Sequence, residues 1–263
     1  MKKVALRKSL FILPNLFTLS SVLCGYYAVL LSSDGAGQES FHRAALLIVF
    51  AMFFDTIDGR VARLTKTQSA IGVQLDSLAD VMSFGMAPAV LVYHWSLRAL
   101  GTAGIFIAFA YVACGCIRLA RFNVISTGEA GAPKTPGKYI LGLPIPAAAG
   151  ILISIVLANN DFGRVQGTPM MVAIVVVALS FFMVSTIKFR SFKDLKLNLR
   201  TAAFVIFATG STAFIALTYG SSLALVWLLA SYVIIGLTET VIGIATRVYR
   251  RGRPREPEEQ LHS

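Results

Sequence analysis

The sequence predicts an all-α integral membrane protein with about eight transmembrane helices, on the evidence of its composition and the lengths of its apolar runs. Of the 263 residues, 56% are hydrophobic and only 14% are charged, and the mean hydropathy is +0.72. A water-soluble domain of this size needs more polar surface. The apolar runs span roughly 17 to 25 residues, the length of a helix that crosses a bilayer. The alternating segments of a membrane barrel do not occur in the sequence, and an open sheet would leave backbone groups unsatisfied in lipid.

Short polar or glycine-containing segments separate the predicted spans. The first span follows a basic segment, residues 1–12, which we expect either to lie on an anionic membrane surface as an amphipathic helix or to act as a plain cytoplasmic anchor. Because a polar turn and further spans follow the first apolar run, we expect no cleaved signal peptide. The predicted spans are residues 13–33, 42–62, 77–97, 101–121, 140–158, 168–187, 201–218 and 222–246.

Four aspartates at fixed spacing mark the second and third predicted spans. Asp55 and Asp58 are three residues apart, and Asp76 and Asp80 are four apart, so each pair projects from one face of its own helix. Two such faces that meet would form a site for divalent metal. Each aspartate costs roughly 2.5 to 3.5 kcal/mol at bilayer depth. Two carboxylates 4 Å apart repel by about 4 kcal/mol at an effective dielectric constant of 20, so the group requires compensation.

The type of ligand indicates which metal this site would take. Oxygen ligands without a nearby cysteine or histidine favour Mg²⁺, Mn²⁺ or Ca²⁺ over zinc or copper. Two ions that share the four carboxylates would leave coordination positions open for phosphate oxygens, as in two-metal phosphoryl transfer. The alternative is that the carboxylates merely pair at the helix ends with Arg60, Arg63 and Lys66. The spacing and the embedded glycines are not needed for such surface pairing, so we favour the metal site.

Small and basic residues beside the first acidic pair indicate a phosphorylated ligand. Gly59 and Ala62 lie on the same turn as Asp55 and Asp58, where missing side chains would let a bulky ligand approach the helix backbone. Arg63 follows one turn later, where its guanidinium group could bind a phosphate in a bidentate manner. A substrate with a nucleotide head and a lipid tail would fit a site at the membrane edge.

The basic residues predict how the chain is oriented. Only three of the 24 lysines and arginines, Arg43, Arg98 and Arg164, fall on one side of the eight-span arrangement. By the positive-inside rule, both termini and the aspartate motif face the cytoplasm, in the inner or plasma membrane of a cell. The net charge of +11 then reflects topology and some affinity for acidic membrane lipids, and we expect no nucleic-acid binding.

The acidic motif resembles the signature of the CDP-alcohol phosphatidyltransferases at every specified position. That signature is Asp-x-x-Asp-Gly-x-x-Ala-Arg, eight residues, Gly72, three residues, Asp76, three residues and Asp80. The resemblance implies transfer of the phosphatidyl group from CDP-diacylglycerol to an alcohol, with release of CMP and with two divalent cations, Mg²⁺ or Mn²⁺, as cofactors. It implies that Asp55, Asp58, Asp76 and Asp80 bind the metals and that Asp80 is also the catalytic base. It also implies that six residues contact CDP-diacylglycerol: Asn15, Thr18, Gly59, Ala62, Arg63 and Gly72.

The same resemblance suggests a division of the chain and an assembly. Residues 1–12 would form an N-terminal interfacial segment, and residues 13–158 the catalytic core. Residues 159–246 would add further helices, and residues 247–263 would form a mobile tail of basic and acidic residues. Members of the family commonly form homodimers through their transmembrane helices, so we expect a homodimer.

The acceptor alcohol depends on weaker signals. The segments Pro14–Thr18, Ser83–Ala89 and Gly142–Pro146, together with Arg118–Asn123, resemble the branch of the family that uses L-serine. Two guanidinium groups three residues apart, on Arg118 and Arg121, can bind a carboxylate, and Asn123 can bond to a hydroxyl or ammonium group. The same arginines could instead mark the end of a span or hold a phosphate of the donor.

Two other functions remain open from the sequence. The first is the same transfer to another acceptor, such as glycerol 3-phosphate or inositol phosphate. The second is a metal or lipid transporter without enzymatic activity, because carboxylates among transmembrane helices can line an ion path. No second acidic layer continues across the predicted spans, which weighs against transport.

Overall fold

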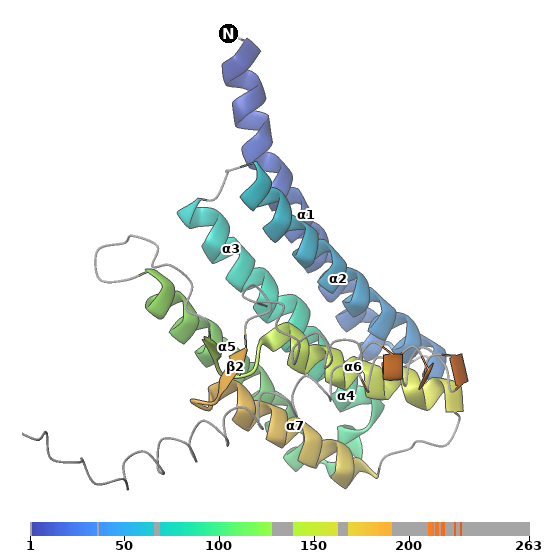
Figure 1. Cartoon of the computed structure of the whole chain (residues 1–263). Coiled ribbons are helices and arrows are strands. Elements are labelled where there is room, and N and C mark those ends of the chain that lie inside the picture. Colours follow the sequence, from blue (N-terminus) through green and yellow to red (C-terminus); the bar gives the residue numbers. More distant parts are fainter. Residues whose placement is uncertain are drawn as a thin grey trace, which may run out of the picture.

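The computed structural model describes most of the N-terminal two thirds of the chain (Figure 1). The described ranges are residues 2–35, 37–65, 69–127, 139–162 and 168–190, with isolated residues between 210 and 227. Within them the chain is helical except for one two-stranded ribbon. Six of the predicted spans fall here, whereas nearly all of 201–218 and 222–246, and the whole of the tail 247–263, lie outside the described residues. The expected number of eight spans therefore stays a prediction.

Helices α1 (Lys2–Ser33) and α2 (Gln38–Leu64) form a long antiparallel hairpin (Figure 1). The turn between them contains Gly35 and Gly37, whose φ angles of 67° and 94° suit a residue without a side chain. The helix α1 is continuous with the predicted interfacial segment 1–12 and begins well before the predicted span at residue 13. Small side chains at three- and four-residue spacing let α1 approach its neighbours closely. They are Thr18, Ser21, Gly25, Ala28 and Ser32, all buried.

The third predicted span, 77–97, is a composite of three helical segments. Helix α3 (Ala70–Asp80) begins at a Ser69 cap, where the Ser69 hydroxyl accepts a hydrogen bond from the Gly72 N–H at 3.0 Å. A π-helical turn, η1 (Val81–Met86), follows without interruption and leads into α4 (Ala87–Trp95). The helix thus starts seven residues before the predicted span, because the cap at Ser69 defines its beginning. Helix α3 runs beside α1 (Figure 1).

A short 3₁₀ turn, η2 (Leu97–Leu100), connects α4 to α5 (Thr102–Thr127), which agrees with the predicted span 101–121. Helices α6 (Ile145–Phe162) and α7 (Pro169–Val184) follow. The predicted start of the fifth span at residue 140 is wrong, because Tyr139–Leu141 form the strand β1, which pairs antiparallel with β2 (Lys188–Arg190).

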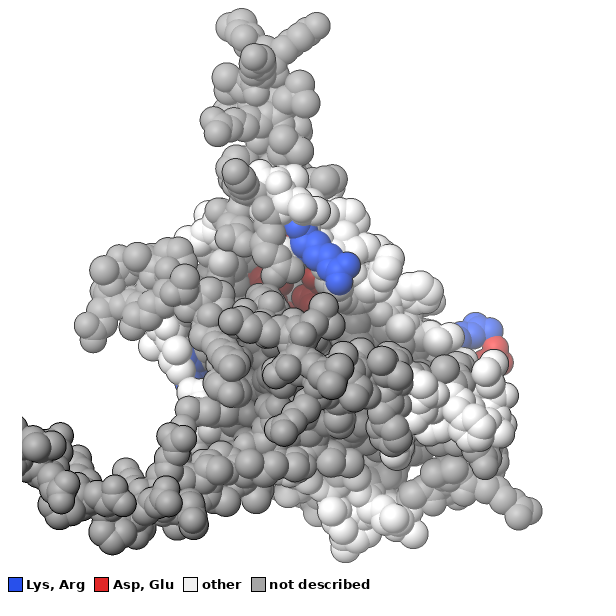
Figure 2. Space-filling view, in the orientation of Figure 1, with Lys and Arg blue, Asp and Glu red and all other residues white. Residues whose placement is uncertain are grey.

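Helix length and hydropathy agree with a membrane protein. Among the described residues, three helical segments are long and apolar enough to cross a bilayer: Asn15–Ser33, Ala70–Trp95 and Thr102–Ile125. Two shorter apolar helices, Ile145–Asn159 and Pro169–Val184, accompany them. The surface that Figure 2 describes is mostly without charge. We conclude that the protein is helical and membrane-embedded, with three to five apolar helices in its described part.

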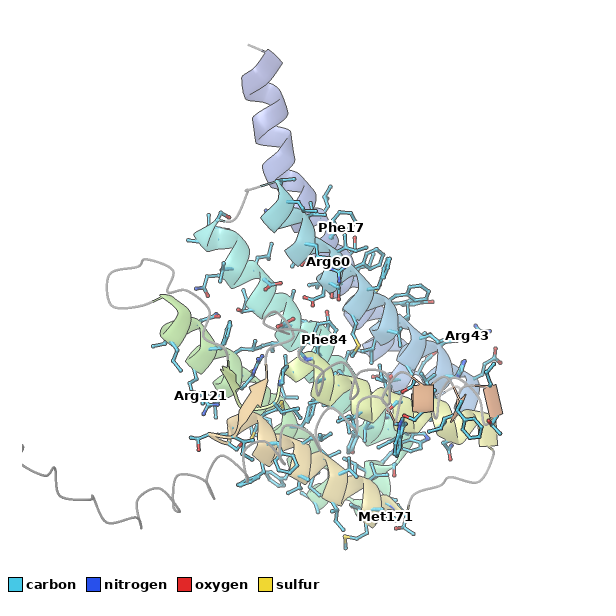
Figure 3. The ribbon with its side chains drawn as sticks, viewed as in Figure 1. Phe17, Arg43, Arg60, Phe84, Arg121 and Met171 are labelled. Atoms are coloured by element: carbon cyan, nitrogen blue, oxygen red, sulfur yellow. The ribbon has the colours of Figure 1, made fainter. Side chains whose placement is uncertain are left out.

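Arg121 of α5 forms hydrogen bonds with the end of α7 and with the ribbon, at the point where these three elements meet (Figure 3). Its guanidinium group donates to the carbonyl oxygens of Val184 at 2.8 Å, Ser185 at 3.1 Å and Leu141 at 3.3 Å. These carbonyls lie at the end of α7 and in β1, where helical partners are missing. One partly buried cation therefore satisfies the end of one helix and fixes the ribbon against it.

Gly142 makes this junction possible. Its φ angle is 77°, and its N–H donates to the Ile187 carbonyl at 2.8 Å. A side chain here would overlap the Met183 carbonyl oxygen and approach the Arg121 guanidinium to 2.9 Å.

We predict that Gly142→Ala destabilises the protein, because it adds both backbone strain and an overlap with the α7 backbone. The expected cost is about 2 to 4 kcal/mol, which corresponds to a fall of roughly 5 to 10 °C in the apparent melting temperature of the detergent-purified protein. Gly210→Ala serves as the control, because no atom of the described residues lies within 4 Å of the position of its Cβ. An unchanged melting temperature for Gly142→Ala would contradict this account of the junction.

Candidate active site

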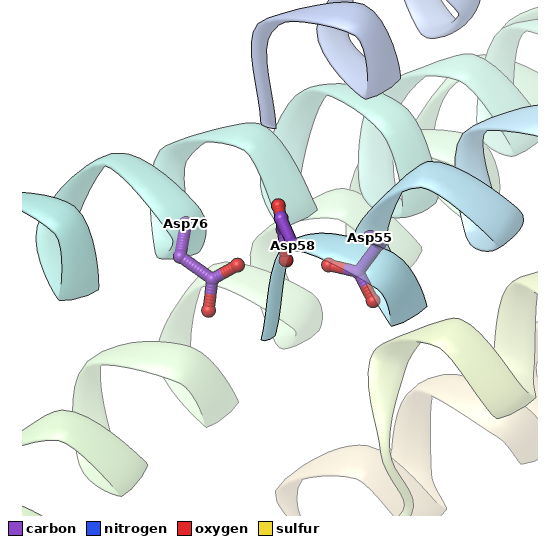
Figure 4. A group of neighbouring side chains, drawn as sticks. All are labelled: Asp55, Asp58 and Asp76. Atoms are coloured by element: carbon purple, nitrogen blue, oxygen red, sulfur yellow. The ribbon is translucent and has the colours of Figure 1, made fainter. Parts of the chain in front are cut away.

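Three of the four predicted metal ligands come together between α2 and α3. Asp55 and Asp58 project from the last turns of α2, and Asp76 projects from α3, so that their carboxylates face one another (Figure 4). One oxygen from each lies within 4.8 Å of the other two. The three-residue spacing on α2 places both of its carboxylates on the face toward α3. The sequence therefore predicted the meeting of the two helix faces correctly for these three residues.

Asp58 is the most deeply buried of the three, with 4% of its surface exposed. The Thr18 hydroxyl on α1 donates a hydrogen bond to Asp58 Oδ2 at 2.7 Å. The predicted contact of Thr18 with CDP-diacylglycerol stays a prediction, and the structure shows its hydroxyl against this carboxylate. A short bond from a buried neighbour fixes the direction of Asp58 before any ligand is present.

Asp80 lies one turn beyond Asp76, at the end of α3, outside the group of three. Its carboxyl group is close enough to that of Asp55 for a hydrogen bond between them, and it interacts electrostatically with Arg118 of α5. Asp80 Oδ1 is buried and has no hydrogen-bond partner among the described residues. Two carboxyl groups in contact require a shared proton or a cation, because both cannot be ionised without compensation.

These observations fit a divalent cation. The donor set consists of carboxylate oxygens, which Mg²⁺ and Mn²⁺ prefer, and the buried Asp80 oxygen lacks the partner that buried polar atoms normally have. In Figure 2 acidic atoms lie in a recess beside a basic side chain, and Arg60 projects from α2 near this region in Figure 3. Because Asp58 is 4% exposed, water screens its repulsion with the other carboxylates poorly, and a bound cation would offset that repulsion.

The residues predicted to contact the nucleotide lie around the same recess. Asn15 of α1 is next to Gly72 of α3, since a Cβ atom on Gly72 would lie 3.9 Å from Asn15 Oδ1. Gly59 and Ala62 follow Asp58 on α2 and are only partly buried, as an approach of ligand to the helix requires. The side chain of Arg63 lies outside the described residues, so its predicted contact with phosphate stays a prediction.

The three residues predicted to bind serine have different surroundings. Arg118 is buried, with 6% of its surface exposed, beside Asp80, and its guanidinium carbon lies 5.6 Å from the centre of the Phe122 ring. Arg121 donates to the three carbonyls of the ribbon junction, so binding a carboxylate would require it to leave some of them. The Asn123 side-chain amide donates to Ser77 Oγ at 2.8 Å, which places it next to Asp76.

Sequence reasoning assigned no individual role to several residues that shape this site. Ser77 links Asn123 to the acidic helix, and Phe122 lies against Arg118. Tyr111 and Ser83 hold the π-turn after Asp80. Only Phe122 had a usable signal, its four-residue spacing from Arg118, which places both on one helix face. The others depend on contacts between helices that are distant in sequence.

Comparison with known proteins identifies the family of this arrangement. Residues 11–186 match the CDP-alcohol phosphatidyltransferase model. The chain belongs to the CDP-alcohol phosphatidyltransferase family. This range contains every site residue discussed above, so the family signature and the recessed carboxylates coincide.

Relatives of this phosphatidyltransferase come from bacteria and archaea. The CDP-diacylglycerol–serine O-phosphatidyltransferase of Helicobacter pylori (strain ATCC 700392 / 26695) is 39% identical over 75% of this chain and 79% of its own length. The protein of the same name from Bacillus subtilis (strain 168) is 35% identical over 69% of this chain and 91% of its own length. The archaetidylserine synthase of Methanothermobacter thermautotrophicus is 36% identical over 69% of this chain and 70% of its own length.

We predict that Thr18→Val weakens metal binding, because it preserves the shape of the side chain but removes the hydroxyl that holds Asp58. Groups that orient a metal ligand typically contribute ten- to a hundredfold to affinity, so we expect a loss of about tenfold. A titration of purified protein with Mn²⁺, followed by electron paramagnetic resonance without substrate, measures this directly.

Thr18→Ser should restore most of the affinity, because it returns the hydroxyl. Ser20→Ala is the matched control on the same helix, since the Ser20 hydroxyl donates to the Leu16 carbonyl of α1 itself. Equal Mn²⁺ affinity in the wild type and in Thr18→Val would show that the bond to Asp58 does not orient a ligand.

Proposed function

We propose that this protein transfers the phosphatidyl group of CDP-diacylglycerol to the hydroxyl of L-serine, producing phosphatidylserine and CMP. The observation that carries this proposal is that relatives from two bacterial lineages, 39% and 35% identical over more than two thirds of the chain, are named as serine O-phosphatidyltransferases. The archaeal relative is named for a different lipid but for the same acceptor. Serine is thus the shared feature of the three names.

The donor would bind at the recess between α1, α2 and α3. We propose that Asp55, Asp58, Asp76 and Asp80 hold two divalent cations, Mg²⁺ or Mn²⁺, and the group of three carboxylates supports this assignment. When bound, such ions would neutralise the diphosphate and the negative charge on departing CMP. Six residues would line the nucleotide side, where Asn15 and Gly72 are neighbours. They are Asn15, Thr18, Gly59, Ala62, Arg63 and Gly72.

Asp80 would accept the proton of the serine hydroxyl as that oxygen attacks the lipid-side phosphorus. Its position supports this role, because it lies at the edge of the acidic group with one buried oxygen that has no hydrogen-bond partner among the described residues. The neighbouring Arg118 offsets part of the repulsion among the carboxylates. Among the described residues the acidic group contains no cysteine or histidine, and the sequence shows no serine, cysteine or histidine with an evident activating partner, so we favour direct transfer over a covalent enzyme intermediate.

The acceptor site would lie on α5, beside Asp80. Arg118 has five N–H donors, enough to face Asp80 and still bind the serine carboxylate. Asn123, which reaches Ser77 next to Asp76, would bind the hydroxyl or ammonium group from the other side. The three carbonyl bonds of Arg121 favour a supporting role for this residue, which holds α5 against α7 and the ribbon.

The orientation and assembly belong to the same proposal. The positive-inside distribution of lysine and arginine supports a multi-pass protein of the inner or plasma membrane, with both termini and the active site facing the cytoplasm. A homodimer within the membrane is expected from the family, and its substrates would be CDP-diacylglycerol from the bilayer and L-serine from the cytoplasm.

We predict that detergent-purified protein releases CMP from CDP-diacylglycerol only when both L-serine and Mn²⁺ or Mg²⁺ are present. Parallel reactions with glycerol 3-phosphate, with inositol phosphate and without acceptor show which alcohol is used. Asp80→Asn keeps the shape of the side chain but cannot accept the proton, and we expect it to fold without turnover; near-normal activity in this variant would refute the role of Asp80. Release with another acceptor would refute serine as the substrate. Metal uptake into sealed vesicles without CMP release would favour a transporter.

We predict that Arg118→Lys raises the KM for L-serine by about ten- to a hundredfold, because an ammonium group cannot form the bidentate bond that a guanidinium forms with a carboxylate. The KM for CDP-diacylglycerol should change by less than about threefold, since the donor lies on the α1 to α3 side. Initial rates of CMP release at varied concentrations of each substrate separate the two effects. Parallel increases in both KM values would place Arg118 on the donor instead.

A further inference from the structure

The helix that carries Asp76 and Asp80 changes its winding directly after Asp80. Residues Val81–Met86 form the π-turn η1, in which the Ala87 N–H donates to the Met82 carbonyl five residues earlier. A π-turn contains about one residue more than an α-helical turn, so it changes the direction of all following side chains by about 100°. The turn therefore sets how the acidic end of α3 is oriented relative to α4.

Pro88 explains why the winding changes here. In an α-helix the N–H of residue 88 would bond to the carbonyl of Phe84, but proline has no N–H and its ring would clash with that carbonyl. The extra residue of the π-turn relieves the clash. The Phe84 carbonyl then needs another donor, and the Tyr111 hydroxyl of α5 supplies it at 3.1 Å. Both Phe84 and Tyr111 are fully buried.

A second clamp holds the same turn from the α1 side. Ser83 donates from its hydroxyl to the Ser21 carbonyl at 3.0 Å, and the Ser21 hydroxyl donates to Ser83 Oγ at 3.2 Å. Gly25 leaves room for this contact, because a Cβ atom there would lie 2.8 Å from the Ser83 Cα atom. The π-turn is thus fixed between α1 and α5 by side-chain hydroxyls.

The same helix, α5, contacts both the π-turn and the proposed base Asp80. Tyr111 and Arg118 are seven residues apart, two turns along one face of α5, and they contact the segment at Phe84 and at Asp80 respectively. A single helix face therefore holds both ends of the stretch from Asp80 to Phe84.

We propose that Tyr111 and Ser83 are positioning residues that direct the Asp80 carboxylate toward the serine hydroxyl by holding the proline-induced π-turn. This inference rests on the proposed function, in which Asp80 accepts the proton. Asp80 directly adjoins the π-turn, whereas Asp76 lies one turn earlier on α3 and Asp55 and Asp58 lie on α2. Loss of either clamp is therefore expected to slow proton transfer more than it weakens metal binding.

Tyr111→Phe tests this, because it removes only the hydroxyl and keeps the buried ring. We expect kcat for serine-dependent CMP release, calculated per Mn²⁺-binding protein, to fall about ten- to a hundredfold. The Mn²⁺ dissociation constant and the KM for CDP-diacylglycerol should change much less than kcat, because three of the four proposed metal ligands do not adjoin the turn. Tyr27→Phe, on a half-exposed tyrosine of α1, is the matched control and should behave as the wild type.

Ser83→Ala tests the opposite clamp and should give the same signature, which keeps the proposal testable if Tyr111→Phe does not fold. Wild-type kcat in both variants would overturn the inference. A parallel loss of kcat and Mn²⁺ affinity would also overturn it, because the clamps would then support the whole site. If the wild type uses another acceptor, the same comparison is made with that acceptor, and only serine specificity fails. A wild type without any turnover refutes the proposed function itself.

Discussion

The mutual repulsion of aspartates in a recess within apolar helices is the constraint on which the rest of the structure depends. Carboxylates held within 4.8 Å of one another are stable only if the helices that bear them are fixed and a compensating charge is at hand. The hairpin of α1 and α2 provides the fixed frame, and α3 is set against it by close packing of small residues. Arg118 supplies part of the compensation from α5.

The division of labour among the arginines follows from their surroundings. Arg118 and Arg121 are three residues apart on one helix, yet the first faces the acidic group and the second faces backbone carbonyls. Hydrogen bonds of this kind satisfy a helix end that would otherwise require water, which is scarce within a membrane. The Arg118 guanidinium group therefore offsets negative charge in the acidic group, whereas the Arg121 guanidinium group holds the end of α7 and the ribbon together.

Much of the acidic site could be predicted from the sequence because helical periodicity alone determines which residues share a face. The spacing of Asp55, Asp58 and Asp76 was sufficient to predict that their carboxylates meet. The partner of Asp58 was not predictable, because Thr18 is forty residues away and its contact depends on how α1 packs.

The π-turn was missed for a related reason. Pro88 in the sequence predicts a disturbed helix, but the hydroxyl that satisfies the Phe84 carbonyl comes from another helix. The carbonyl contacts of Arg121 were not predictable either, because nothing local in the sequence marks those carbonyls.

The bond between Thr18 and Asp58 also has a consequence for biogenesis. The two residues belong to the first helical hairpin, so they can meet as soon as α2 enters the bilayer beside α1, before α3 is synthesised. A carboxylate that inserts alone costs roughly 2.5 to 3.5 kcal/mol, and an early hydrogen bond offsets part of that cost. Asp58 would thus enter the membrane together with its hydrogen-bond partner, and its carboxylate would already be oriented when α3 docks onto the hairpin.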